Sequence, residues 1–140
     1  MGRVLILRTD GAARGNPGPA AAGLVIETLN GDEIACGKQY LGILTNNQAE
    51  YRALVLGLTE ISQYRPEEIL VYMDSELVVR QMNGQYRVKD ELLRETYNEA
   101  QLLVRQLPKV TIQHVRRGQN ARADRLANQA LDEQAKRSQS

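Results

Sequence analysis

The stretch Thr45-Asn-Asn-Gln-Ala-Glu-Tyr-Arg-Ala-Leu54, together with Ile-Leu-Val-Tyr-Met at residues 69–73, decides the fold class. Thr45 and the Gln three residues later have the spacing of a capping box, and apolar residues at helical spacing follow, so we expect a helix over residues 46–64. Pro66 comes after that helix, and the five apolar residues beyond it are typical of a buried strand. A helix that leads into a buried strand indicates an α/β protein.

Working outward from this unit, the same signals place the other elements. We expect strands over residues 3–9, 22–29, 33–41 and 110–115, a short helix from Ser75 to Asn83-Gly84, a helix from Asp90 to Leu107, and a last helix capped by Asn120. Asn30-Gly31 predicts a hairpin turn, and residues 14–19 are a loop rich in Gly and Pro. Because a hairpin is antiparallel and helix crossovers favour parallel pairing, we expect a mixed sheet with helices packed on its faces.

Composition limits what the protein can be. With 140 residues, 42% hydrophobic and 25% charged, the chain is expected to form one globular domain over residues 1–140, with a frayed tail from about residue 134. The absence of Phe and Trp excludes a stacking platform built from those residues, and a net charge of +1 argues against nucleic-acid binding by charge alone. The single cysteine, Cys36, excludes an internal disulfide and a cysteine-based zinc site. No apolar run is long enough to span a membrane, so we expect a cytoplasmic chain without a targeting segment.

Three acidic residues occupy positions where packing favours apolar side chains. Asp74 directly follows the strand at residues 69–73, and Asp10 follows the apolar run Val4–Leu7 by three residues. Glu50 lies three and four residues before Ala53 and Leu54, on the apolar stripe of its helix. Each acid alone is explained by a helix cap or an ion pair. Together, at strand ends and helix starts, they are expected to converge at the carboxyl edge of the sheet.

A fourth acid, Asp124, shares a face of the last helix with Ala127, Leu131 and Ala135. A carboxylate near a core must be paired, neutralised or bound to metal, because desolvating it alone is costly. Four carboxylates without a cluster of Cys and His form a hard, oxygen-rich ligand set that suits Mg²⁺ or Mn²⁺ and disfavours zinc. Composition and spacing therefore predict an acidic metal site on an α/β sheet, and they do not identify a substrate.

Four local strings extend this interpretation. They are Asp10-Gly-Ala-Ala-Arg-Gly-Asn-Pro-Gly-Pro19, Thr45-Asn-Asn-Gln-Ala-Glu-Tyr-Arg-Ala-Leu54, Asp74-Ser-Glu-Leu-Val-Val-Arg-Gln81 and Ala123-Asp-Arg-Leu-Ala-Asn128. In this order, over nearly the whole chain, they closely resemble ribonuclease H type 1. The resemblance implies a five-stranded mixed sheet of order 3-2-1-4-5 with strand 2 antiparallel. It also implies endonucleolytic cleavage of the RNA strand of an RNA–DNA hybrid, leaving 5′-phosphate and 3′-hydroxyl ends.

The resemblance assigns the four acids, Asp10, Glu50, Asp74 and Asp124, as catalytic ligands of two Mg²⁺ or Mn²⁺ ions that straddle the scissile phosphate. We expect Asp10 to bridge both ions, because strand ends are the stiffest positions. Glu50 would orient one ion and the neighbouring 2′-hydroxyl. Asp124, at a helix start, is expected to move most during turnover.

The same matches imply substrate contacts. They are Gly11 before the first loop, Arg14, Gly15 and Asn16 on that loop, Thr45, Asn46 and Asn47 at the helix start, and Gln81 in the short helix. Side-chain amides donate and accept hydrogen bonds, and the wide minor groove of an RNA-containing duplex displays 2′-hydroxyls. Thr45 matches a residue of a pocket for a phosphate of the DNA strand. An alternative stays open, in which Asn16 only shapes its loop and Thr45 and Asn46 only cap a helix.

The sequence departs from the family pattern around the DNA strand. Many relatives carry a basic, Trp-containing protrusion that grips the hybrid, whereas residues 84–90 are short here and hold only Arg87 and Lys89. Asp90 stands where relatives often have Asn, and Ile43 replaces a basic residue found in some. Both changes are expected to weaken phosphate binding.

A second departure lies before the last helix, where many relatives have a longer loop with a His that helps the product leave. His114 is the only His in this chain, and it alternates with Val110 and Ile112, so we expect it to be a structural residue of the strand. Arg116 or Arg117 could instead act near the scissile phosphate, since a guanidinium is a planar phosphate donor. A solvated basic turn explains these two arginines equally well.

Three functions compete at this point. The first is a monomeric endonuclease for RNA–DNA hybrids that needs no obligatory protein partner and no membrane. The second is a nuclease of the same fold that acts on another duplex, such as double-stranded RNA. The third is a hybrid-binding module without catalysis, which the presence of all four acids disfavours.

Overall fold

The computed structural model describes residues 3–139. The strands of the sheet are β1 (Val4–Ala13), β2 (Gly18–Thr28), β3 (Glu33–Leu44), β4 (Glu68–Met73) and β5 (Val110–His114). The helices are α1 (Asn46–Ser62), α2 (Glu76–Met82), α3 (Glu91–Gln106) and α4 (Ala121–Gln139), with a short 3₁₀ helix η1 (Arg117–Asn120) before α4. The order of strands and helices agrees with the one predicted from the sequence.

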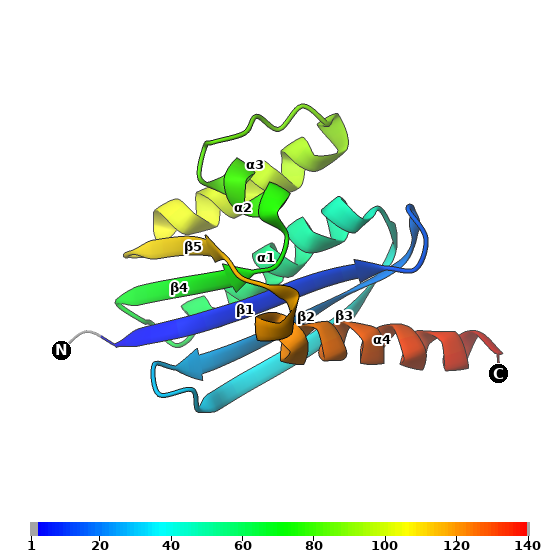
Figure 1. Cartoon of the computed structure of the whole chain (residues 1–140), viewed down its shortest axis with the longest axis horizontal. Helices are drawn as coiled ribbons and strands as arrows, with labels where there is room; N and C mark the ends of the chain where they lie inside the picture. Colours follow the sequence, from blue (N-terminus) through cyan, green and yellow to red (C-terminus); the bar gives the residue numbers. More distant parts are fainter. Residues whose placement is uncertain (1–2, 140) are drawn as a thin grey trace.

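The sheet has the order β3-β2-β1-β4-β5 (Figure 1). β2 pairs antiparallel with both β1 and β3, whereas β1 with β4 and β4 with β5 are parallel. The hairpin turn at Asn30-Gly31 is present, and Gly31 has a φ of 90°, a conformation that glycine adopts without a steric penalty. The mixed sheet of order 3-2-1-4-5 with strand 2 antiparallel is therefore confirmed.

Helices cover both faces of the sheet, as expected. α1, α2 and α3 lie on one side and α4 crosses the other (Figure 1). Under α1 the core is built from large aliphatic residues, among them Leu5, Leu7 and Leu58, all fully buried. Under α4 the contacts come from small residues such as Ala21 and Ala130. Small side chains allow α4 to approach the sheet closely, and this closeness matters for the site.

Two boundaries in the β1–β2 hairpin differ from the sequence prediction. β1 continues to Ala13, so Asp10 lies within a strand and not beyond the end of one. Gly18 and Pro19 belong to β2 and not to a loop, since the hairpin between β1 and β2 is shorter than the Gly-Pro composition indicated. In both cases pairing with a neighbouring strand extends the strand through residues of low strand propensity.

The last helix also differs in detail. Asn120 belongs to η1 and does not cap α4, because its Oδ1 accepts no hydrogen bond from residues 3–139, while its Nδ2 donates to the carbonyl oxygen of Thr9 at 2.8 Å. Ala135 is exposed, so the buried stripe of α4 stops at Leu131. The helix continues to Gln139, through the residues from about 134 for which a frayed tail was expected, and Ser140 lies outside the described residues. Across residues 3–139, no helix combines the length and the apolar character needed to cross a bilayer.

Candidate active site

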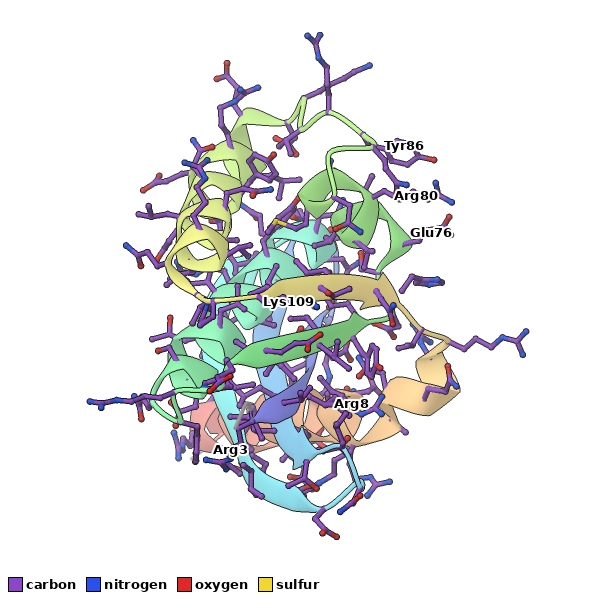
Figure 2. All side chains as sticks on the ribbon, turned by 90° about the vertical axis from the view of Figure 1, so that its left-hand side faces the viewer. Arg3, Arg8, Glu76, Arg80, Tyr86 and Lys109 are labelled. Atoms are coloured by element: carbon purple, nitrogen blue, oxygen red, sulfur yellow. The ribbon has the colours of Figure 1, made fainter. Side chains whose placement is uncertain are left out.

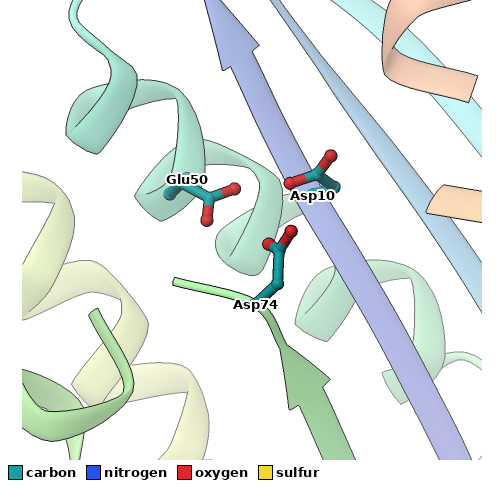
Figure 3. A group of neighbouring side chains, drawn as sticks. All are labelled: Asp10, Glu50 and Asp74. Carbon is teal, nitrogen blue, oxygen red and sulfur yellow. The ribbon is translucent and has the colours of Figure 1, made fainter. Parts of the chain in front are cut away.

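Three of the four expected acids meet at one point (Figure 3). Asp10 comes from β1, Glu50 from the second turn of α1, and Asp74 from the residue that follows β4. One carboxylate oxygen from each of the three lies within 4.8 Å of the other two. Residues that are far apart in the sequence therefore form a single acidic cluster, as the sequence predicted.

The geometry of the sheet explains why they meet. The pairing of β1 with β4 ends at Arg8 and Tyr72, so beyond this point the edge of β1 is open on the β4 side. Asp10 and Gly11 lie along that open edge. The backbone N–H of Gly11 donates a hydrogen bond to Oε1 of Glu50. The end of β4 thus creates the space, and the backbone next to Asp10 binds the second acid.

Gly11 is required because α1 crosses β1 at contact distance. A Cβ at this position would lie 2.2 Å from the carbonyl carbon of Ala49 and 2.4 Å from the backbone nitrogen of Glu50. Real Cβ atoms do not come that close to backbone atoms, so only glycine fits. The close approach brings the start of α1, and with it Glu50, against the strand that carries Asp10.

The cluster is electrostatically unfavourable without a cation. Burial raises the pKa of the Asp10 carboxyl far above its usual value, and the charges of Glu50 and Asp74 raise it further. Burial also raises the pKa of Glu50, although the hydrogen bond from Gly11 opposes this shift. A positive charge placed among the three carboxylates would relieve both effects.

The donor set fits a hard divalent cation. All the converging ligand atoms are carboxylate oxygens, and within residues 3–139 no Cys or His joins the group. Oxygen-only sites favour Mg²⁺ and Mn²⁺ over zinc. The residues present therefore match the kind of metal that the sequence predicted.

The fourth acid, Asp124, lies beside this cluster and not within it. Its carboxyl group lies near enough to Asp10 to contribute to the raised pKa of the Asp10 carboxyl. α4 reaches this position by crossing β2 at Gly23, the residue paired with Asp10, where a Cβ would lie 2.1 Å from the carbonyl oxygen of Ala123. The same strand pair thus places both Asp10 and the helix that carries Asp124.

Asn16 and Asn46 are brought together next to the site. Oδ1 of Asn16 accepts from the backbone N–H of Asn46 at 3.0 Å, and Oδ1 of Asn46 accepts from the backbone N–H of Ala13 at 3.2 Å. Both carbonyl oxygens of the amides are thereby used, whereas neither Nδ2 group has a partner within the described part of the chain. Two exposed amide donors therefore remain available at the start of α1.

The other expected contact residues of the first loop and of the start of α1 differ in their exposure and in their hydrogen bonds. Gly15, at φ 113°, and the exposed Arg14 belong to the turn between β1 and β2. The capping box is confirmed, since Thr45 Oγ1 accepts from the backbone N–H of Gln48 at 3.2 Å. Asn47 is half-buried in the first turn of α1. The cap accounts for Thr45 structurally, so the structure leaves its expected phosphate contact open.

Gln81 is placed differently from the expectation. It is only 5% exposed, and its Oε1 accepts from the hydroxyl of Tyr51 at 2.7 Å. Its Nε2 donates to the carbonyl oxygen of Arg87 at 3.3 Å. Both ends of this amide are engaged inside the protein, and contact of Gln81 with the minor groove stays a prediction.

The two arginines after β5 differ in position. Arg117 approaches the cluster, with Nε 3.9 Å from Oδ2 of Asp74, and its side chain is 87% exposed. Arg116 is exposed and is the N-cap residue of η1. The turn is held to β1 by Arg8, whose Nη1 donates to the carbonyl oxygen of Gln119 at 2.7 Å. Of the two, Arg117 is the one positioned to meet a phosphate at the acidic site.

His114 is the clearest correction on this edge of the sheet. It pairs with Met73 at the last step of the β4–β5 ladder, next to Asp74, but its side chain is exposed. His114 does point to the same face of the sheet as Ile112, as the alternation predicted. β5 is an edge strand and His114 is its last residue, so the core that buries Ile112 does not extend over it.

The region expected to grip the DNA strand is small. Asp90 is the N-cap of α3 and accepts from the backbone N–H of Leu92 at 2.9 Å, and Ile43 is 64% exposed. Figure 2 shows Glu76 and Arg80 of α2 next to Tyr86, which follows the helix. The guanidinium carbon of Arg80 lies 5.3 Å from the ring centroid of Tyr86. This stacked pair lies next to the short connection at residues 84–90.

One residue of the site was missed as a separate candidate. Asn128 donates from Nδ2 to Oδ1 of Asp124 at 3.3 Å. Its spacing of four residues from Asp124 on one helix was the available signal, since residues at i and i+4 are neighbours on a helix surface.

An α/β sheet of this order with acids at the open edge of its central strand defines the class: a protein of the ribonuclease H fold with a candidate metal site. A family model described as "Reverse transcriptase-like" matches residues 8–130. The chain is 43% identical over 124 residues to "Ribonuclease HI" of Halobacterium salinarum, covering 89% of this chain and 62% of that protein. The crystal structure of the Halobacterium RNase H1 matches with a TM-score of 0.90 at 41% identity, covering 93% of this chain and 98% of that one.

Two further solved structures of RNase H proteins have the same fold as this chain. The N-terminal RNase H domain of the "Bifunctional protein Rv2228c" of Mycobacterium tuberculosis has a TM-score of 0.92 at 42% identity, covering 97% of this chain and 99% of that one. LC11-RNase H1 in complex with an RNA/DNA hybrid has a TM-score of 0.90 at 40% identity, covering 94% and 99%. The chain belongs to the ribonuclease H type 1 family. It spans 35% of the length of the full mycobacterial relative.

Proposed function

We propose that the chain is a metal-dependent endonuclease that hydrolyses the RNA strand of RNA–DNA hybrids and leaves 5′-phosphate and 3′-hydroxyl ends. The convergence of Asp10, Glu50 and Asp74 beside the free amide donors of Asn16 and Asn46 is the observation that carries the proposal. The related LC11-RNase H1, which forms a complex with an RNA/DNA hybrid, supports the choice of substrate.

The four acids would hold two Mg²⁺ or Mn²⁺ ions. When bound, the ions supply the positive charge that activates a water molecule and stabilises the departing oxygen. Asp10 occupies the centre of the acids, since it interacts with Glu50, Asp74 and Asp124. Gly11 restricts the Glu50 carboxylate to one orientation by donating to Oε1, which leaves Oε2 for the site.

Recognition of RNA would come from the amides at the start of α1. The Nδ2 groups of Asn16 and Asn46 are donors, and ribose 2′-hydroxyls and the minor-groove edges of bases offer acceptors. The oxygen of each amide is bound to backbone, so the donors are held in place before substrate arrives. The exposed guanidinium of Arg117 would bind a phosphate near the acids, because it projects beside Asp74 and is free of other ion pairs in residues 3–139.

Parallel cleavage assays test the proposal. Labelled RNA–DNA hybrid, duplex RNA and duplex DNA are incubated separately with Mg²⁺ and with Mn²⁺, and the ends of the products are mapped. We expect cleavage of the RNA strand of the hybrid alone. Equal cleavage of duplex RNA would favour the broader nuclease, and binding of hybrid without cleavage by either metal would favour a binding module.

The organisation expected from the sequence forms part of the same proposal. We propose that residues 1–140 act as one catalytic domain, as a monomer without an obligatory protein partner, in the cytoplasm. Light scattering of the purified chain tests the monomer, and fractionation of cells that express it tests the location.

A further inference from the structure

A chain of hydrogen bonds leads from Arg14, in the turn between β1 and β2, to Asp124. Nδ2 of Asn128 donates to the carbonyl oxygen of Asp124 at 3.0 Å and to Oδ1 of Asp124 at 3.3 Å. Nη2 of Arg14 donates to Oδ1 of Asn128 at 3.4 Å and to Oδ1 of Asp132 at 2.7 Å. Asp124 therefore does not project freely from α4, because its neighbour one helical turn away holds one of its oxygens.

The backbone that carries Asp124 has little freedom to move. Asn120 is fully buried and donates to the carbonyl oxygen of Thr9, the residue before Asp10. Ala123 packs directly against Gly23, the strand partner of Asp10. With the start of α4 fixed at two points, the adjustable part of this acid is its side-chain rotamer. Asn128 is the residue that restricts that rotamer.

The chemistry of the amide suits this task. Nδ2 is only a donor, so it can hold a carboxylate without competing with it for a cation. Oδ1 of Asn128 faces the guanidinium of Arg14, which has only donors, so the amide has one favoured orientation. Arg14 and Asp132 are both largely exposed, and an exposed ion pair adds little stability. What this ion pair contributes is the orientation of the amide.

We infer that Asn128 is a positioning residue that holds the Asp124 carboxylate toward Asp10 for binding of a divalent cation. The inference rests on the proposed function in one respect, namely that Asp124 contributes to the metal site. Residues that hydrogen-bond to metal ligands commonly change metal affinity or activity by about 10- to 100-fold when they are replaced.

The first measurement needs no nucleic acid. Thermal unfolding of wild type and Asn128→Ala is followed against Mn²⁺ concentration, and the apparent Mn²⁺ affinity is taken from the shift in Tm. We expect Asn128→Ala to weaken Mn²⁺ binding by about 10-fold or more, with a Tm in chelator close to that of wild type. Gln129→Ala is the matched control, since Gln129 is on the same turn, is half-buried and has no side-chain hydrogen bond in the described chain. It should bind Mn²⁺ like wild type.

A double-mutant cycle then separates positioning from a general structural effect. If Asn128 acts through Asp124, Asn128→Ala should cause no further loss of Mn²⁺ affinity in an Asp124→Asn background. The same fold-loss in both backgrounds, or an Asn128→Ala variant indistinguishable from Gln129→Ala, would overturn the inference. Hybrid cleavage is measured in parallel. A failure of wild type to cleave would refute the proposed function, while the cycle would still decide the role of Asn128.

Discussion

The backbone N–H of Gly11 donates a hydrogen bond to the Glu50 carboxylate, so the residue after one acid of the cluster holds another acid in place. This link depends on the absence of a side chain at position 11, because α1 lies against β1 there. The same glycine therefore serves both the packing of the fold and the geometry of the site.

The Gly11→Ala substitution should destabilise the protein strongly. The new Cβ would lie within 2.2 to 2.4 Å of backbone atoms of Ala49 and Glu50, and backbone cannot rotate away as a flexible side chain can. We expect a loss of about 3 kcal/mol or more in the free energy of unfolding, at the upper end of overpacking effects. Urea unfolding measures it. Gly118→Ala is the control, because a Cβ there meets nothing within 4 Å, and its stability should be unchanged or slightly higher.

The Gln81→Ala substitution distinguishes a structural glutamine from a substrate contact. It would leave the buried hydroxyl of Tyr51 without its acceptor, which costs about 1–3 kcal/mol. We expect a lower Tm and an unchanged KM for hybrid. A raised KM with an unchanged Tm would show that Gln81 does reach the substrate. Gln85→Ala, at an exposed position, should change neither quantity.

Cleavage should require 2′-hydroxyls close to the cut. The free donors of Asn16 and Asn46 have no other partners in the described chain, and a deoxyribose offers them one acceptor fewer. Replacing the ribonucleotides that flank the cleavage site with 2′-deoxynucleotides should block cleavage at that site. The same replacement several nucleotides away is the control and should leave the rate unchanged. Unimpaired cutting at the modified site would rule out sensing of the 2′-hydroxyl.

Much of the fold could be predicted because local signals agreed with tertiary packing. The capping box at Thr45, the Asn30-Gly31 turn and the apolar strand before Asp74 all depend on a few neighbouring residues. The three-acid cluster could be predicted for a related reason, although Asp10 lies within β1: Asp74 follows the carboxyl end of the neighbouring strand β4, and Glu50 lies near the start of a helix.

What could not be predicted depends on distant parts of the chain. The length of β1 depends on its pairing with β2 as far as Ala13, and the burial of Gln81 depends on Tyr51, thirty positions away. The exposure of His114 depends on where the helices stop covering β5. Alternation within one strand indicates the face of a side chain, but it does not indicate whether anything packs against that face.

This difference changes what we expect of His114→Ala. Alternation alone predicted a structural residue whose loss would lower stability. Because the side chain is exposed, we expect the free energy of unfolding to change by no more than about 0.5 kcal/mol. Ile112→Ala, on the same face but buried, should lose about 2–4 kcal/mol. Urea unfolding of both variants tests this, and a large loss for His114→Ala would mean that the histidine packs against the core after all.

The Asp10→Asn substitution should abolish cleavage and, in the absence of metal, raise stability. The pKa of Asp10 is raised by burial and by the charges of Glu50 and Asp74. At neutral pH this acid therefore either carries a repelled charge or takes up a proton against its intrinsic tendency, and both cost free energy. Asn has nearly the same shape and incurs neither cost. We expect a higher Tm than wild type in chelator, and a smaller gain in Tm from millimolar Mg²⁺ or Mn²⁺, since a ligand stabilises only the state that binds it.

The pH dependence of the metal-free protein provides an independent check. A carboxyl whose pKa is higher in the folded state than in the unfolded state lowers stability as it loses its proton. The pKa of Glu50 is raised from 4.5 to about 7, so the stability of wild type in chelator should fall as the pH rises through this interval. Added Mg²⁺ should remove most of that fall, because the cation neutralises the same charges. Thermal unfolding from pH 4 to pH 8, with and without metal, measures both effects.

If Asp10→Asn is less stable than wild type in chelator and responds to metal as wild type does, the acids do not form one shared metal site.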